Sequence, residues 1–208
     1  MRGLKRVGKF FLGVLTGLFT LGLIVGAVFG VKGYLMSREA LEQLPVEEMA
    51  EEIQADEHFT TIEELPELYV QAVIAAEDQR FWTHGGYDLI AIGRALWNDL
   101  RTLSFAEGGS TITQQLAKNQ YFTQEKRIER KVAEVFAAVE IEAVFTKEEI
   151  FELYVNTIYF GSGYYGIYDA AMGYYGKEPS ALSDAEAVML AAAYASGASL
   201  YDGAGRSD

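Results

Sequence analysis

The sequence predicts a mainly α-helical protein with one N-terminal transmembrane helix. The run Phe10–Val31 holds 22 residues without a charge, and about 20 apolar residues span a bilayer as a helix. Beyond this run, apolar residues recur at helical spacing and several segments begin with helix-capping residues. Strand signals are scarce and no internal repeat is present. The chain of 208 residues therefore suits one membrane anchor and one domain.

The charges around the apolar run predict its orientation. Four basic residues lie within positions 1–9, whereas Lys32 alone follows closely. The positive-inside rule makes residues 1–9 a cytoplasmic basic tail, 10–31 the transmembrane helix, and the rest of the chain an extracytoplasmic domain. A cleaved signal peptide is the alternative, but its apolar region normally has about 7–15 residues. An uncleaved anchor is therefore preferred.

Residues 32–62 resemble a polar, Glu-rich stalk that is helical in part, and we expect the domain at 63–208. Pro66 can open a helix that ends near Glu77 or Asp78. Residues 88–103 are apolar on too many sides for a surface helix, so a buried helix and a segment that dips into lipid both stay open.

The later elements follow from turn and capping signals. Residues 98–109 are expected to form a mobile loop, and a Gly/Tyr-rich turn is expected at 161–166. Thr146 with Glu149 and Ser183 with Glu186 each form a capping-box pattern at a helix start. The helices are expected at about 111–120, 125–145, 147–157 and 183–194.

Composition excludes several classes of site. The chain has no cysteine, which excludes disulfides, thiol catalysis and cysteine-ligated metal. Only two histidines are present, which argues against a His-rich metal site. Beyond Lys32, 12 basic residues face 30 acidic ones, a net charge of −18. Nucleic acid is a poor partner for that balance.

Five of these 12 basic residues fall within fourteen positions: Lys118, Lys126, Arg127, Arg130 and Lys131. The cluster can be a solvated helix face or a local anion site. Gly108–Gly109 lead into the first of the helices involved, whose N-terminus offers free backbone N–H groups to an anion.

Glu77 is the candidate general base. It ends an apolar helix beside Phe81 and Trp82, where the helix dipole and partial desolvation both favour proton uptake by a carboxylate. A polar helix end before a glycine turn is the simpler alternative. Arg130 and Glu134 are i, i+4 neighbours, either as a surface pair or as part of a phosphate site. Seven tyrosines between Tyr154 and Tyr175 are either core residues or sugar contacts.

Five blocks together resemble the peptidoglycan glycosyltransferases of glycosyltransferase family 51. The family patterns are E-D-x-x-F-x-x-H-x-G, G-G-S-T-I-T-Q-Q-x-x-K-N, R-K-x-x-E, E-L-Y-x-N-x-x-Y-F-G-x-G-x-Y-G and L-x-x-A-E-A-x-x-L. In this sequence they match Glu77–Gly86, Gly108–Asn119, Arg130–Glu134, Glu152–Gly166 and Leu182–Leu190. Gly85 falls at the variable position of the first block and Gly86 at the fixed one. The five blocks are in order, and the resemblance covers about residues 66–190.

The resemblance implies a lysozyme-like helical domain on a membrane anchor, in the bacterial cell membrane. It implies polymerisation of lipid II into β-1,4 glycan strands, with inversion and release of undecaprenyl pyrophosphate. The expected partners are lipid II, the growing glycan chain, the bilayer and other cell-wall synthesis proteins, without nucleic acid. A divalent cation, Mg or Mn, at the pyrophosphate is an option rather than a requirement.

The resemblance also assigns roles to residues. Glu77 is expected to be the base and Glu134 the second essential carboxylate, which would orient Arg130 or help hold a divalent ion. Lys118 and Arg130 are expected to bind the pyrophosphate, assisted by Lys131 and by the N–H groups near Ser110 and Thr111. Substrate contacts or shaping roles are expected, by resemblance alone, for Asp78, Phe81, His84, Thr111, Gln114, Gln115 and Asn156.

One departure from the family is visible. Members usually continue past the last helix with a Pro-containing segment, whereas Tyr194–Tyr201 lacks proline and the sequence stops at Asp208. We expect either a short monofunctional enzyme or a piece of a longer chain. Two other functions stay open: a membrane-anchored lysozyme-like hydrolase and a non-catalytic scaffold that binds lipid II.

Overall fold

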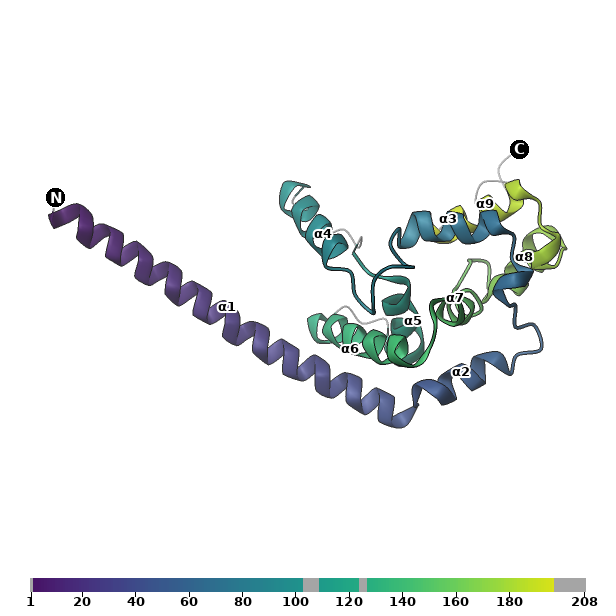
Figure 1. The fold of residues 1–208 in the computed structure, drawn as a ribbon, viewed down its shortest axis with the longest axis horizontal. Helices are drawn as coiled ribbons and strands as arrows, with labels where there is room; N and C mark the ends of the chain where they lie inside the picture. Colours follow the sequence, from purple (N-terminus) through teal and green to yellow (C-terminus); the bar gives the residue numbers. More distant parts are fainter. Residues whose placement is uncertain (1, 103–108, 124–126, 197–208) are drawn as a thin grey trace.

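The computed structural model describes residues 2–102, 109–123 and 127–196. Within these ranges the chain is helical and has no β-strand, apart from an isolated bridge between Tyr159 and Tyr165. This confirms the predicted mainly α fold. The elements are α1 (Arg2–Gln43), α2 (Val46–Gln54), η1 (Ile62–Glu64), α3 (Glu67–Glu77), α4 (Leu89–Thr102), α5 (Ile112–Tyr121), α6 (Ile128–Val144), α7 (Lys147–Val155), α8 (Ile167–Tyr175), η2 (Pro179–Ala181) and α9 (Asp184–Ser196) (Figure 1).

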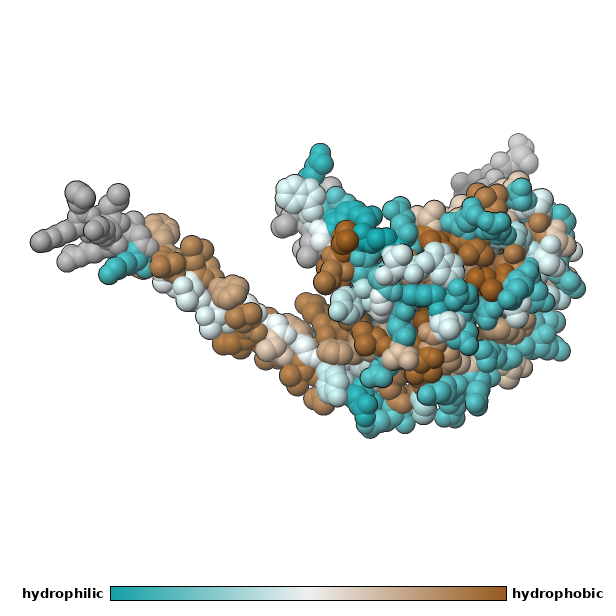
Figure 2. Space-filling model, in the orientation of Figure 1, coloured by the Kyte–Doolittle hydropathy of each residue, from teal (hydrophilic) through white to brown (hydrophobic). Residues whose placement is uncertain are grey.

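Helix α1 is long and apolar enough to cross a membrane over the segment Lys9–Gln43. It contains the predicted span 10–31 and extends away from the rest of the chain as one continuous rod (Figure 1). Large apolar side chains cover its outer part, as the brown colouring of the rod shows (Figure 2). An exposed apolar surface of this length matches the hydrocarbon core of a bilayer.

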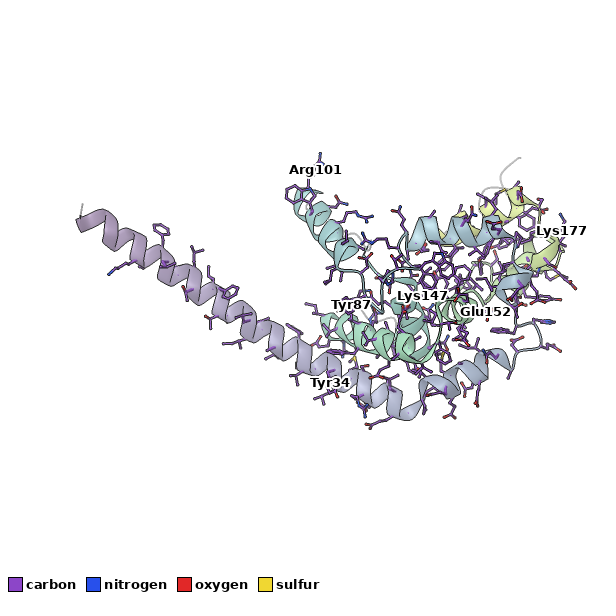
Figure 3. The ribbon with its side chains drawn as sticks, in the orientation of Figure 1. Tyr34, Tyr87, Arg101, Lys147, Glu152 and Lys177 are labelled. Carbon is purple, nitrogen blue, oxygen red and sulfur yellow. The ribbon has the colours of Figure 1, made fainter. Side chains whose placement is uncertain are left out.

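The inner part of α1 packs against α6 instead of standing apart as a stalk. The Lys32 ammonium lies 3.6 Å from the Glu129 carboxylate, and the ring centroids of Tyr34 and Phe136 are 5.4 Å apart (Figure 3). Helix α2 follows and buries Val46, Met49 and Ala50. The segment predicted as a stalk therefore contributes to the domain surface and core.

The core lies where α3, α5, α6, α7 and α9 meet. Helix α3 lies along α9, and α5 contacts both α6 and α7 (Figure 1). The largest fully buried side chains of the core include Tyr69, Phe81, Phe151, Tyr154 and Phe160. Burial of such side chains supplies the main driving force for this fold, at about 25 cal/mol per Å² of apolar surface.

Capping residues fix several helix starts. The Thr146–Glu149 and Ser183–Glu186 hydrogen bonds are present at α7 and α9, as the sequence predicts. Helix α3 begins after Pro66 and ends at Glu77, also as predicted. A further capping box, Thr111 with Gln114, opens α5.

Two expectations about the region before α5 are corrected. Helix α4 continues to Thr102, so residues 98–102 are helical, and the rest of the expected loop, 103–108, lies outside the described residues. Leu89, Ile90 and Trp97 are 71%, 65% and 67% exposed. The buried-helix interpretation is therefore wrong for this face of α4, which projects from the domain (Figure 1).

Candidate active site

Glu77 lies at the end of α3 and lines a small cavity of about 90 Å³. One carboxylate oxygen, Oε2, accepts a hydrogen bond of 2.8 Å from Nε2 of Gln115 on α5. Among the described residues, the other oxygen has no hydrogen-bond partner. The remaining lining residues are Ala76, Asp78, Gln79, Arg80, Asp88, Ala91, Arg94, Ser110 and Thr111.

Asp78 holds the end of α3 against the start of α5. Its buried carboxylate accepts a hydrogen bond of 3.1 Å from the backbone N–H of Ile112. It also pairs with Nε2 of His84 at 2.8 Å, while Nδ1 of His84 faces the carbonyl oxygen of Gly85. Burial opposes a charged imidazole, but the hydrogen bonds to Asp78 and Gly85 outweigh burial and raise the pKa of His84.

Asp88 caps the start of α4 and pairs with Arg80. Its carboxylate accepts hydrogen bonds from the N–H groups of Ile90 (2.9 Å) and Ala91 (3.0 Å) and from Nε of Arg80 (2.9 Å). Burial favours the neutral acid, but these donors outweigh burial and lower the pKa of Asp88 to about 2. Asp88 thus stays an anion matched to Arg80.

The potential ligand atoms of Asp78, His84 and Asp88 lie within 4.8 Å of one another, which is metal-like spacing. However, both ring nitrogens of His84 face acceptors, and both carboxylates already receive hydrogen bonds. A metal needs free lone pairs on its ligands. This group therefore fits a structural network better than a metal site.

Thr111 and Gln114 hold Gly86 in place. The Thr111 hydroxyl and Nε2 of Gln114 each donate a hydrogen bond of 3.2 Å to the carbonyl oxygen of Gly86. The two side chains are 1% and 2% exposed. Their positions give them a positioning role, and direct substrate contact by either one stays a prediction.

Phe81 is buried and Asn156 is half-buried. Phe81 is fully buried, with the Lys147 ammonium (labelled in Figure 3) 4.5 Å from its ring centroid. Asn156 exchanges two hydrogen bonds with the backbone of Thr60, at 2.9 and 2.8 Å, and so joins the end of α7 to the segment before η1. Both side chains have structural partners within the protein, and contact of either one with substrate stays a prediction.

A buried carboxylate on α6 organises two of the predicted cations. Glu134 is 1% exposed, and its two oxygens lie 3.0 Å from Arg130 and 2.8 Å from Lys131. The Lys131 ammonium also donates to the Ser110 hydroxyl, which lines the Glu77 cavity. Charge-assisted contacts of this kind fix long side chains in one place. Lys131 thus contacts a residue that lines the Glu77 cavity but does not line the cavity itself.

Arg130 faces a second and larger cavity, of about 260 Å³, between α1 and the α5–α6 junction. Lys118, on α5, is partly exposed, lines neither cavity and has no ion-pair partner among the described residues. The second cavity is lined by Met36, Glu39, Ala40, Gln43, Tyr121, Phe122, Thr123, Arg127 and Arg130.

Sequence reasoning missed several residues of the Glu77 cavity. Asp88 had a readable signal, because an acidic residue directly before an apolar helix is a common N-cap. Arg80, in the turn after α3, and Arg94, on α4, had no such signal, because an isolated arginine in a sequence does not reveal which cavity it lines.

Comparison with known proteins identifies the family of this helical domain. A protein-family model described as transglycosylase matches residues 44–206. The chain belongs to the transglycosylase family. Membership confirms the predicted family and the enzyme class, and it extends over α2 to α9, with the candidate residues inside the matched range.

Several relatives of this transglycosylase are penicillin-binding proteins. Penicillin-binding protein 1A of Aquifex aeolicus is 48% identical over 134 residues, 64% of this chain and 18% of its own length. The 1A protein of Vibrio cholerae is 46% identical over 130 residues (62% and 16%), and protein 1F of Bacillus subtilis is 44% identical over 132 residues (64% and 18%). Each match thus spans less than a fifth of the relative.

Proposed function

We propose that this transglycosylase polymerises lipid II into β-1,4-linked glycan strands, with inversion at the anomeric carbon and release of undecaprenyl pyrophosphate. One observation supports this most: the Glu77 carboxylate and the hydroxyl that binds Lys131 line one cavity. A glycosyl transfer needs a base for the incoming hydroxyl and positive charge for the departing diphosphate.

Glu77 is the proposed general base. Gln115 holds one oxygen of the carboxylate, so the other is left to accept the proton of the sugar 4-hydroxyl. Asp78 supports this arrangement indirectly, because it fastens the end of α3 to the start of α5, the helix that carries Gln115. A fixed base reduces the reorganisation that the reaction requires.

Lys131, Arg130 and Lys118 are the proposed diphosphate ligands, although Arg130 lines a separate cavity and Lys118 lines neither cavity. Glu134 is buried between Arg130 and Lys131 and holds both in place. Preorganised positive charge stabilises the negative charge that builds up on the leaving group. The N–H groups at the start of α5, near Ser110 and Thr111, add the positive end of a helix dipole.

A divalent cation at Glu134 stays an option in this proposal. Oε1 of Glu134 lies 3.0 Å from Arg130 but is buried without a hydrogen-bond partner among the described residues, whereas Oε2 accepts a hydrogen bond from Lys131. These contacts support the orienting role for Glu134, and no step of the proposed reaction is assigned to a metal ion.

Membrane attachment suits a lipid-linked substrate. Helix α1 carries the candidate span, and exposed apolar residues on α4 add a second apolar surface. We propose that the N-terminus lies in the cytoplasm, as the basic residues at positions 1–9 favour, and that the domain works on the outer face of the bacterial membrane beside other cell-wall synthesis proteins.

The hydrolase alternative needs a second carboxylate to work with Glu77 and water. Among the described residues near Glu77, Asp78 pairs with His84 and Asp88 pairs with Arg80. Glu134 is buried against two cations. These contacts leave Glu77 as the acid group available in its cavity and favour the transferase.

Incubation of the purified chain in detergent with lipid II, followed by separation of products by length, tests the proposal. We expect a ladder of glycan strands and released undecaprenyl pyrophosphate. A parallel incubation with polymeric peptidoglycan should release no sugar. Sugar release without use of lipid II would establish the hydrolase instead, and lipid II binding without either product would establish the scaffold.

A further inference from the structure

Gln115 stands at the centre of a hydrogen-bond network that joins four helices. Its Nε2 donates to Glu77 on α3, and its Oε1 accepts from the hydroxyls of Tyr154 on α7 (3.3 Å) and Tyr194 on α9 (2.7 Å). The rings of the two tyrosines meet edge to face, with centroids 5.9 Å apart. The shorter contact makes Tyr194 the stronger of the two donors.

These partners fix which way the Gln115 amide points. A carboxylate only accepts hydrogen bonds, so the amide nitrogen must face Glu77. The two phenols then face the amide oxygen and must donate. Burial raises the pKa of Tyr154, and burial also raises that of Tyr194 to about 12, so both hydroxyls keep their protons at neutral pH.

Tyr194 lies outside the blocks that identify the family. The last matching block ends at Leu190, and the Pro-free segment that departs from the family pattern begins at Tyr194. Tyr194 is nevertheless the residue of α9 that reaches Gln115, 79 positions away in the chain. The motifs therefore gave no reason to expect a residue here that acts on Glu77.

We propose that Tyr194 is a positioning residue for the transferase: its hydroxyl locks the Gln115 amide so that the N–H group, and not the carbonyl oxygen, faces the general base Glu77. This inference rests on the proposed function. Without the Tyr194 hydroxyl, only the longer hydrogen bond from Tyr154 (3.3 Å) holds the amide oxygen. The amide is then fixed less firmly, so it holds the Glu77 carboxylate less firmly in the position that faces the acceptor hydroxyl.

The Tyr194→Phe variant tests the proposal, because it removes one hydroxyl and keeps the ring. We expect kcat on lipid II to fall about threefold to tenfold, the equivalent of one neutral hydrogen bond, while KM stays within about twofold. Tyr174→Phe, on α8, is the matched control. It removes a hydroxyl that donates at 2.8 Å to the carbonyl oxygen of Phe160, and kcat should stay unchanged.

A double-mutant cycle separates positioning from general loosening of the fold. In a Gln115→Ala background the Tyr194 hydroxyl has no amide to position. Adding Tyr194→Phe should therefore lower kcat no further. Unchanged kcat in Tyr194→Phe, or a loss that repeats in full in the Gln115→Ala background, would overturn the inference. An inactive wild-type chain would instead count against the proposed function, so the two failures are distinguishable.

Discussion

At the scale of single residues, Gly86 shows why one glycine of a pair is fixed in the family pattern and its neighbour is not. A Cβ at Gly86 would lie 2.6 Å from the backbone of Ala138 and Val139 on α6, whereas a Cβ at Gly85 would meet open space. Backbone cannot yield as a flexible side chain can. The contact brings the Gly86 carbonyl within reach of Thr111 and Gln114.

His84 predicts how stability depends on pH. Its pKa is raised in the folded chain, so its contribution to stability is complete below the unfolded value of 6.5 and is lost as pH rises through the raised value. We expect the unfolding temperature to fall over this range. Thermal unfolding in a pH series from about 6 upward checks this.

The His84→Gln variant should be less stable at the acidic end and should lose the part of the pH dependence that His84 supplies. His58→Gln is the matched control. It should keep the pH dependence of stability that His84 supplies, because the Asp78–His84 pair remains. An identical pH profile for wild type and His84→Gln would contradict the assignment.

At the scale of elements, capping residues made the starts of α7 and α9 predictable from the sequence. The start of α8 has no capping residue and was not predicted. Helices α7 and α9 have Thr146 and Ser183 at their starts, but α8 follows Gly166, which has φ 80° and makes no side-chain cap. Local sequence therefore gave α8 no start signal. The apolar pattern of α4 could not separate protein core from lipid, because both reward the same side chains.

The contact between α1 and α6 couples the candidate membrane helix to the helix that carries Arg130, Lys131 and Glu134. It depends on Gly33, where a Cβ would lie 2.5 Å from Cγ1 of Val132. Gly33→Ala should destabilise the chain by about 1–3 kcal/mol through overpacking. Thermal unfolding in detergent measures this.

Gly30→Ala supplies the control for this contact. Gly30 lies on the same helix with no atom within 4 Å of its would-be Cβ, so this change should not lower the unfolding temperature. Equal effects of the two substitutions would show that α1 does not pack on α6 through Gly33.

At the scale of the whole molecule, the sequence identified most chemical groups of the site but not their contacts. Glu77 and Gln115 are 38 positions apart, and Ser110 and Lys131 are 21 apart, so their pairing depends on how α3, α5 and α6 pack. The burial of Phe81 and the hydrogen bonds from Asn156 to Thr60 could not be predicted either, because a motif does not distinguish a substrate contact from a structural support. Capping signals and apolar patterns predicted the helical fold because they act locally.

The central claim is that Glu77 removes a proton while Lys131, Arg130 and Lys118 hold the diphosphate. Measuring lipid II binding and polymerisation separately for Glu77→Gln tests it most directly. Glu67→Gln, the same change at the other end of α3, serves as the control and should behave as wild type.

We expect Glu77→Gln to bind lipid II within about threefold of wild type, because the cations are untouched. We expect it to polymerise at least about 100-fold more slowly, the usual effect of losing a general base. Polymerisation by Glu77→Gln at the wild-type rate would contradict the account.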